Sequence, residues 1–333
     1  MQILIIQTAF IGDVILATAL IEKLKVHHPT AQIDFLLRKG NESLLDAHPH
    51  LRTVLVWDKQ GGKWRNLLKC LKQIRQTRYD IVVNVQRFAS SGILAAFSRA
   101  KSIVGFSKNP FSWLFSKHYP HKIGDNTHET TRNQQLISTW TDTLPARPRL
   151  YPADKYYAQI KTLQAENAGK PYICVAPTSV WFTKQWAEEK WVAFLQQVPP
   201  TYTLYLLGAP SDSPICERIL QNAQPIAQAH IINLAGKLSL LASACLMQDA
   251  TMNYVNDSAP MHLASAMNAP TCAIFCATVP AFGYTPLADK AHIIEVGEVL
   301  SCRPCGLHGQ KKCPEKHFRC AQDIEIKKLL ALL

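Results

Sequence analysis

Several features that assign a protein to a class at a glance are absent from this chain. No apolar run approaches the roughly 18–20 residues of a membrane-spanning helix, which argues against an integral membrane protein. The first residues, MQILIIQTAF, lack the basic segment of a signal peptide and lead directly into a strand pattern, so we expect a cytoplasmic protein. The sequence also lacks zinc-finger, RNA-recognition and helix-turn-helix patterns, internal repeats and low-complexity tracts, so nothing in it specifically indicates nucleic-acid binding.

Acidic residues are scarce relative to basic ones. The chain has 24 Asp and Glu and 36 Lys and Arg, which gives a net charge of +12. This charge predicts an anionic partner such as nucleic acid, a phospholipid surface or a phosphorylated substrate. A basic surface that serves only solubility is the alternative. The ten cysteines indicate free thiols or metal ligands, because disulfide frameworks are typical of small secreted chains and this one has 333 residues. That length, with 47% apolar residues, predicts two domains with full cores.

The N-terminal residues carry the pattern of a β-α-β unit. Residues 2–7 form a buried-strand pattern, Asp13 opens an apolar helix that stops before Pro29, and a second strand covers 33–37. Such a unit implies a parallel sheet with a right-handed crossover. Further elements are predicted as strands over 53–57, 81–85 and 102–104 and a basic helix over 64–76. The sequence FIGD after the first strand has one glycine, which argues against the G-x-G-x-x-G loop of a dehydrogenase.

The strand and helix pattern restarts after the proline-rich segment PARPRLYP, residues 145–152, which we interpret as the linker between two domains. The second domain is predicted to contain strands over 171–176, 203–207 and 252–256, with helices over 156–165, near Ala187 and around Glu217. The alternation of strands and helices predicts an open α/β domain here as well.

The stretch TMNYVNDSAPMHLASAMNAP, residues 251–270, predicts a strand that leads directly into a helix. Asp257 or Ser258 suits the N-cap of that helix, and Pro260 fits its first turn, where a missing N–H costs nothing. The N–H groups of such a helix start, at the carboxyl edge of a sheet, form an anion site that commonly holds a diphosphate. His262 would lie in the same turn. Most junctions of this kind bind nothing, so a purely structural role is the alternative.

Polar side chains also follow two other predicted strands. Asp13 comes after the first strand, where it can be an ordinary N-cap or a base, and the two roles are compatible because a helix N-terminus favours the carboxylate. Ser179, Thr183 and Lys184 follow the strand that ends at Ala176. A lysine there can neutralise a phosphate as a compact point charge, or it can be a solvated loop residue.

Four motifs together resemble glycosyltransferase family 9, the lipopolysaccharide heptosyltransferases. They are FIGDV at 10–14, Ser179 followed by KQW at 184–186, NLAGKLSL at 233–240, and DSAPMHLASAMNAP at 257–270 with AIFCATVP behind it. The chain departs from the family pattern twice, with Ala259 in place of a glycine and Cys276-Ala277 in place of Gly-Pro. If that glycine position requires a positive φ angle, Ala259 would be strained.

The resemblance implies a GT-B architecture, an α/β fold with two Rossmann-like domains that face each other across a cleft. Residues 1–150 would bind the acceptor and residues 151–333 the nucleotide-sugar. Asp13 is then the base that takes the proton of the acceptor hydroxyl, and Lys184 stabilises the departing diphosphate. The implied donor contacts are Ser179, Thr183, Lys184, Asp257, Ser258, Ala259 and His262, with Glu217 at the ribose and Leu238 beside the adenine.

The function implied by the resemblance is inverting transfer of heptose from ADP-heptose to the inner core of lipopolysaccharide, with Kdo-lipid A or heptosyl-Kdo-lipid A as acceptor. No cofactor would be required for catalysis, because Lys184 and the helix N-terminus can neutralise the diphosphate. An anionic glycolipid acceptor suits the net positive charge of the chain and implies a cytoplasmic enzyme attached to the inner face of the inner membrane. We expect a monomer that does not bind nucleic acid. The alternatives are a family 9-like transferase that modifies a protein or uses another nucleotide sugar, and a non-enzymatic basic α/β module that binds nucleic acid or membranes.

A basic wall in the first domain is the predicted acceptor site. Its candidates are Arg38, Lys39, Lys63, Arg65, Lys69 and Lys72. Arg65, Lys69 and Lys72 fall at i, i+4 and i+7 of the predicted helix, so they share one face. No acidic residue lies between Trp64 and Arg78 to compensate these charges. A soluble helix face that happens to be basic is the alternative.

The segment CRPCGLHGQKKCPEKHFRC, residues 302–320, forms a cysteine-rich tail. The predicted ligands for a structural Zn or Fe are Cys302, Cys305, Cys313 and Cys320, with His308 and His317 as spare ligands. The spacing of the second cysteine pair does not match common zinc fingers, so free thiols that shape a loop are the alternative. Some family 9 members carry such a tail and others lack it, so the resemblance does not make it necessary for the chemistry. Protein-directed heptosyltransferases also bear a cysteine metal site, which keeps the protein-modifying alternative open.

Overall fold

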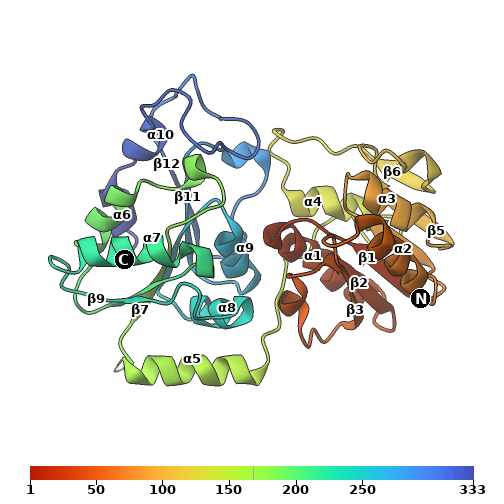
Figure 1. The fold of residues 1–333 in the computed structure, drawn as a ribbon, viewed down its shortest axis with the longest axis horizontal. Helices are drawn as coiled ribbons and strands as arrows, with labels where there is room; N and C mark the ends of the chain where they lie inside the picture. Colours follow the sequence, from red (N-terminus) through yellow and green to blue (C-terminus); the bar gives the residue numbers. More distant parts are fainter. Residues whose placement is uncertain (168) are drawn as a thin grey trace. The chain divides into compact units, whose positions relative to one another are not determined.

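The computed structural model describes residues 1–167 and 169–333, which divide into two compact units, Met1–Tyr151 and Pro152–Leu333 (Figure 1). Each unit contains one six-stranded sheet whose neighbouring strands all run parallel. Figure 1 colours the first unit from red to yellow and the second from green to blue. The predicted α/β fold class is therefore observed in both units.

The first sheet has the strand order β3-β2-β1-β4-β5-β6. Its strands are β1 (Gln2–Ile6), β2 (Gln32–Arg38), β3 (Leu51–Trp57), β4 (Ile81–Asn84), β5 (Ser102–Phe106) and β6 (Lys117–Tyr119). Its helices are α1 (Ile11–His27), α2 (Lys63–Ile74), α3 (Ala89–Ala96) and α4 (Glu129–Gln134), with short 3-10 turns η1 (Glu42–Leu45), η2 (Ser112–Leu114) and η3 (Gln135–Ile137).

Helices cover both faces of the first sheet, which is why its central strands are mostly apolar. Leu4 and Ile6 of β1 share a core with α2 and α3, as do Trp57 and Val82 from neighbouring strands. Because successive side chains of a strand point to opposite faces of the sheet, Ile3 points to the other face, where α1 and α4 contact each other. A strand buried on both sides reads as a continuous apolar run, as QILIIQ does.

The second sheet has the strand order β12-β11-β10-β7-β8-β9. Its strands are β7 (Tyr172–Ala176), β8 (Thr203–Leu206), β9 (His230–Asn233), β10 (Met252–Asn256), β11 (Thr271–Phe275) and β12 (Ala291–Glu295). Its helices are α5 (Asp154–Glu166), α6 (Glu188–Leu195), α7 (Ser213–Ala223), α8 (Leu240–Gln248), α9 (Ala259–Ala266), α10 (Arg319–Gln322) and α11 (Ile326–Leu330), with 3-10 turns η4 (Phe182–Lys184), η5 (Pro210–Asp212) and η6 (Pro280–Phe282).

The core of the second unit lies mainly under α6, α7 and α11. Trp191 and Phe194 of α6 pack there with Tyr254 of β10, whose hydroxyl donates to the carbonyl of Leu329 at 2.9 Å. A second group of helices is centred on α8, which contacts both α5 and α9. Within the described parts of the chain, every helix is too short or too polar to cross a bilayer.

One helix start differs from the sequence prediction and another agrees with it. α1 begins at Ile11, before Asp13, and the Asp13 carboxylate accepts the N–H of Phe10 at 3.2 Å from inside the first turn. Asp13 therefore caps the helix without being its N-cap. α9 begins at Ala259, with Ser258 at the N-cap position and Pro260 in the first turn, as the sequence predicts. Ala259 is not among the residues with positive φ, so the replacement of glycine brings no strain.

The order in which the chain builds each sheet reverses once. In the first sheet the reversal falls between β1 and β4, and in the second it falls between β7 and β10. At such a point the loops after the two strands diverge and leave a crevice at the carboxyl edge, where ligands bind in open α/β sheets. Polar side chains at these two points are therefore the candidates for a functional site.

Candidate functional site

A buried ion pair marks the reversal point of the second sheet. Nζ of Lys184, in the turn η4 after β7, lies 2.8 Å from Oδ2 of Asp257, the residue that follows β10. The two side chains are 16% and 8% exposed. The same carboxylate oxygen accepts the hydroxyl of Thr278, in the loop after β11, at 2.6 Å. The loops after three adjacent strands thus meet at one carboxylate.

The side chain of Asn256 fixes the loop that carries Lys184. Its Oδ1 accepts the N–H of Trp186 at 2.9 Å, and its Nδ2 donates to the carbonyl of Pro177 at 2.8 Å. Asn256 is fully buried at the end of β10. Both ends of the loop after β7 are therefore bonded to one amide, which holds Lys184 at a defined place on the sheet edge.

The start of α9 adds positive potential beside this ion pair. Ser258 and Ala259 are partly exposed there, and His262 is buried one turn further on. The first-turn N–H groups of a helix carry a partial positive charge. An ammonium has three donors, of which Asp257 uses one, so Lys184 can still bind a ligand oxygen. This arrangement suits a phosphate or diphosphate.

The other predicted donor residues lie along the same sheet. Ser179 is partly exposed in the loop after β7, and Thr183 is buried with its hydroxyl bonded to the main chain of Gln310. Glu217 is exposed on α7, and its Oε2 accepts from Nδ2 of Asn233, at the end of β9, at 3.1 Å. Leu238 is partly buried just before α8.

The structure therefore brings together Lys184, Asp257, Ser258, Ala259 and His262, and it places Glu217 two strands away along the sheet. That spacing is compatible with an extended ligand whose two ends contact different loops. Sequence reasoning missed Asn256 and Thr278, because their partners are distant in the chain.

Asp13 lies at the reversal point of the first sheet, in the first turn of α1. Burial raises its pKa to about 6, and the nearby negative charge of Glu129 adds to the rise, while the N–H of Phe10 and the charge of Arg38 oppose it. A carboxyl with a pKa near neutrality suits a general base. Nothing in the sequence around Asp13 predicts this contribution from Glu129.

Glu129, on α4, is a buried carboxylate with two partners of its own. Nε of Arg132 donates to it at 2.7 Å, and Nε2 of His121 lies 3.1 Å away. Although burial opposes its ionisation, His121 and Arg132 hold the pKa of Glu129 below its ordinary value. The negative charge that Asp13 experiences is therefore permanent at neutral pH.

The basic residues predicted to form the acceptor wall fall into two places. Arg38 ends β2, with its guanidinium carbon 4.9 Å from the ring centre of Phe10, so it is close to Asp13. Lys39 instead pairs with Asp58 at 2.9 Å. The remaining four lie exposed on α2 and are Lys63, Arg65, Lys69 and Lys72.

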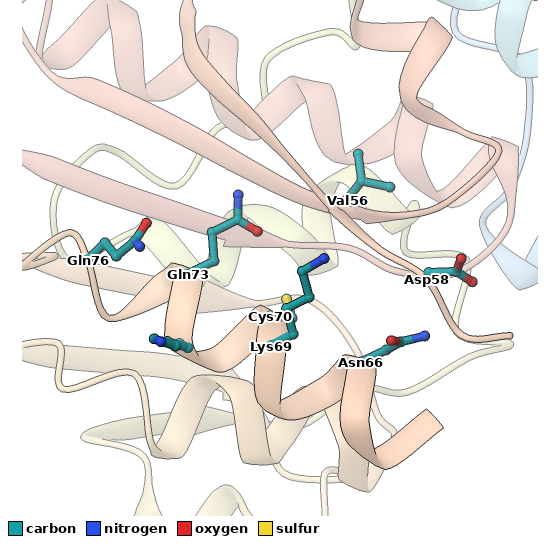
Figure 2. Close-up of a pocket in the computed structure, with 8 residues that line it drawn as sticks. Val56, Asp58, Asn66, Lys69, Cys70, Gln73 and Gln76 are labelled. Atoms are coloured by element: carbon teal, nitrogen blue, oxygen red, sulfur yellow. The ribbon is translucent and has the colours of Figure 1, made fainter. Parts of the chain in front are cut away.

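A hollow of about 710 Å³ lies between α2 and the edge strand β3. Lys69 and Lys72 line it together with the amides of Asn66, Gln73 and Gln76. Figure 2 shows Lys69 and Gln73 extending from α2 toward the strand that carries Val56. The four basic residues of α2 form what we call the basic stripe, and two of them, Lys69 and Lys72, face this polar groove. The groups best placed for chemistry lie elsewhere, at the carboxyl edges of the two sheets.

The cysteine-rich tail does not form the predicted four-cysteine metal site. In the described residues no three His, Cys, Asp or Glu side chains converge as metal ligands would. Sγ of Cys305 instead donates to the carbonyl of Cys302 at 3.3 Å. Burial and neighbouring thiols raise the pKa of Cys320 to about 12 and also raise that of Cys305, so both are protonated. In this structure Cys305 is hydrogen-bonded within the tail and Cys320 is buried.

Comparison with known proteins identifies relatives along nearly the whole chain. The sequence profile of glycosyltransferase family 9 (heptosyltransferase) matches residues 67–317. Lipooligosaccharide heptosyltransferase 2 of Haemophilus influenzae is 25% identical over 320 residues, which cover 91% of each chain. The structure of E. coli ADP-heptose LPS heptosyltransferase II matches with a TM-score of 0.81 and 20% identity, over 100% of this chain and 97% of that one. The structure of a family 9 glycosyltransferase of Veillonella parvula matches with a TM-score of 0.86 and 19% identity, over 99% of this chain and 95% of that one. The fold is accordingly of the GT-B class, as expected.

We predict that Asp257→Asn destabilises the second unit more than Asp58→Asn destabilises the first. The amide removes the counter-charge of a largely buried Lys184, which should cost about 1–3 kcal/mol of unfolding free energy. Asp58 pairs with an exposed Lys39 over a similar distance, 2.9 Å, and water can replace that interaction. Equilibrium urea unfolding of both variants measures the difference. Equal losses would show that burial adds nothing to the Lys184–Asp257 pair.

Proposed function

This chain belongs to glycosyltransferase family 9, the heptosyltransferase family, and from that premise we propose that it transfers heptose from ADP-heptose to the inner core of lipopolysaccharide. As a glycosyltransferase it is an enzyme, which sets aside the non-enzymatic binding module. The names of the relatives, a lipooligosaccharide heptosyltransferase and an ADP-heptose LPS heptosyltransferase, support the acceptor class and the donor. The observation that carries the proposal is the Lys184–Asp257 pair beside the start of α9.

In the proposed donor site, Lys184 and the first turn of α9 bind the diphosphate of ADP-heptose. Ser179, Ser258 and the main chain at Ala259 line the same edge, with His262 in the next turn. As the bond to the anomeric carbon breaks, negative charge grows on the departing ADP, and positive groups already in place stabilise it without reorganisation. This supply of charge is why the proposed reaction needs no cofactor.

The nucleoside would extend along the sheet toward β9. Glu217 is exposed there and steadied by Asn233, so its two carboxylate oxygens can accept both ribose hydroxyls. Leu238, partly buried before α8, would provide an apolar surface for the adenine. Thr183 is buried and already bonded to Gln310, so its contribution to donor binding is indirect.

In the proposed acceptor site, Asp13 takes the proton of the attacking hydroxyl. The acceptor oxygen forms a bond to the anomeric carbon while the bond from that carbon to the ADP oxygen breaks, so the configuration inverts. The proton ends on Asp13 and the electron pair leaves with ADP. Arg38, which is close to Asp13, would attract an acidic acceptor.

The helix α2 supports peripheral attachment to an anionic membrane. Its exposed face carries Trp64 and Leu68, which are 65% and 64% exposed, among lysines and arginines. Indole rings and aliphatic side chains favour the headgroup boundary, and basic residues favour anionic lipid. The same helix would then meet a glycolipid acceptor at the inner face of the inner membrane, where lipid phosphates and sugar carboxylates are exposed.

Mass spectrometry of core oligosaccharide from a strain lacking this enzyme tests the proposed function. Loss of heptose from the core, restored by the intact gene, supports it and identifies the residue that accepts the sugar. A complete core together with the loss of a glycan from a protein would instead support the alternative of a protein-modifying transferase. A core that keeps its heptose but lacks a different sugar would support another nucleotide-sugar donor.

We predict that Asp13→Ala abolishes transfer while ADP still binds, because the proposed ADP contacts lie in the other unit. A general base typically raises the reaction rate roughly 10²–10⁴-fold, so turnover should fall at least about 100-fold. In the wild type, kcat/KM should decline as the pH falls through about 6, where the Asp13 carboxyl takes up a proton and can no longer act as a base. Steady-state kinetics and ADP calorimetry measure both effects. A variant that keeps more than about a tenth of the turnover would exclude the general-base role.

We predict that the double variant Arg65→Glu, Lys69→Glu raises the KM for the acceptor and leaves the KM for ADP-heptose unchanged. Both side chains are exposed on one face of α2, so reversal of their charge should repel an anionic glycolipid. The matched control is Lys161→Glu, Lys170→Glu, which changes the charge of exposed residues in the second unit by the same amount. Equal effects of the two double variants on acceptor KM would show that the stripe does not bind the acceptor.

We propose further that the tail cysteines bind a structural Zn or Fe after the loop adjusts. Four thiols within residues 302–320 are close enough to affect one another's pKa, and thiolates select soft metals. Binding would deprotonate them and draw them together. We therefore predict roughly one Zn or Fe per chain in protein purified without chelator, and its loss when Cys305 and Cys313 are changed to Ser. Elemental analysis that finds no stoichiometric metal in the intact protein would contradict this.

A further inference from the structure

The cysteine-rich tail is bonded directly to the turn that carries Lys184. The N–H of Thr183 donates to the carbonyl of Gln310 at 3.1 Å, and the N–H of Gln310 donates to the hydroxyl of Thr183 at 2.7 Å. That hydroxyl lies 3.3 Å from the Gln310 carbonyl and donates to it. Thr183 immediately precedes Lys184, so the tail fixes the main chain next to the lysine.

The tail also reaches the other member of the ion pair. The N–H of Cys305 donates to the carbonyl of Ala277 at 2.9 Å, and Nη2 of Arg303 donates to the carbonyl of Thr278 at 2.7 Å. Thr278 in turn donates its hydroxyl to Asp257. The tail therefore supports Lys184 through Thr183 and Asp257 through Thr278.

Gly309 makes the closest approach between the tail and the lysine. Its φ angle is +77°, and a Cβ atom there would lie 3.0 Å from Cγ of Lys184 and 3.0 Å from Oγ1 of Thr183. Gly306, in the same loop, has a similar φ of +73°, but a Cβ there would meet nothing within 4 Å. Of these two glycines, Gly309 alone needs the lack of a side chain for packing as well as for its backbone conformation.

We propose that two residues of the tail, Gly309 and Gln310, are positioning residues of the donor site and set the place of the Lys184 ammonium. This inference rests on the proposed function, in which Lys184 binds the donor diphosphate. A long lysine side chain that hangs free samples many rotamers, and the tail limits them by packing against its stem. Charge stabilisation of a leaving group depends on such placement, because a small displacement of the charge weakens it.

A tail that merely stabilises the second unit is the competing explanation. Its C-terminal part does have structural contacts, since Trp186 donates its indole N–H to the carbonyl of Ala321 at 3.0 Å and Phe182 stacks on Phe318. Damage to those contacts would lower stability without a selective effect on one substrate. The test must therefore separate donor binding from folding.

The test compares Gly309→Ala with Gly306→Ala in the full-length protein, with Lys184→Ala as a reference. Both glycine variants force alanine into the same left-handed backbone region, so their difference isolates the contact with Lys184 and Thr183. We expect Gly309→Ala to raise the KM for ADP-heptose and the Kd for ADP by roughly tenfold, with acceptor KM unchanged. Gly306→Ala should stay near the wild-type values. Thermal melting of each variant shows whether it folds.

The outcomes distinguish this inference from the function on which it rests. Equal donor constants for the two glycine variants would overturn the positioning role, even if Lys184→Ala weakens ADP binding as the proposed function requires. A lower Tm for Gly309→Ala without a change in donor KM would overturn it as well and leave the tail a structural role. Normal ADP binding by Lys184→Ala would instead overturn the proposed donor site itself.

Discussion

Parallel strand pairing is the constraint on which the rest of this protein depends. Parallel neighbours need a crossover between them, so helices cover both faces of each sheet and all carboxyl ends gather at one edge. At that edge most loops are covered by the next helix, except where the strand order reverses. Asp13 lies beside the reversal in the first sheet, and Lys184 and Asp257 lie on the two sides of the reversal in the second. The chemically important groups are therefore placed by topology before any contact between them forms.

Local sequence patterns were sufficient to predict the elements that lead to these points. A continuous apolar run predicts a central strand because such a strand is buried on both faces, and 252–256 was predicted with the bounds that β10 has. The junction DSAP predicts a helix start because Ser and Pro suit the N-cap and the first turn. Asp257, Ser258 and His262 follow from that junction alone. The strands β6, β9, β11 and β12 were missed. Exposed or partly exposed residues interrupt the apolar run in β6, β9 and β12, whereas β11 is fully buried and its apolar run was not assigned to a strand.

Interactions between distant parts of the chain could not be predicted in the same way. Thr278 bonds to Asp257 across 21 residues, and Gln310 bonds to Thr183 across 127, and no local periodicity encodes either contact. The start of α1 was misplaced for a related reason: an aspartate can accept a main-chain N–H from the N-cap or from inside the first turn. Cysteine spacing alone predicts metal ligands, but it does not predict that Cys305 donates to the carbonyl of Cys302 or that Cys320 packs in the core. Ala259 shows the converse, because a departure from the family pattern proved compatible with an ordinary helix start.

Each unit closes its own hydrophobic core, the first from residues between 4 and 115 and the second from residues between 173 and 329. A mutation that repacks one core consequently leaves the packing of the other unchanged. On the proposed assignment, the residues that select the acceptor and those that bind the nucleotide-sugar are inherited in separate blocks that meet at the proline-rich segment around Tyr151. Recombination within that segment can exchange one block intact. A bacterial lineage can thereby acquire a new acceptor preference, and a new surface glycan, while its supply of activated sugar stays the same.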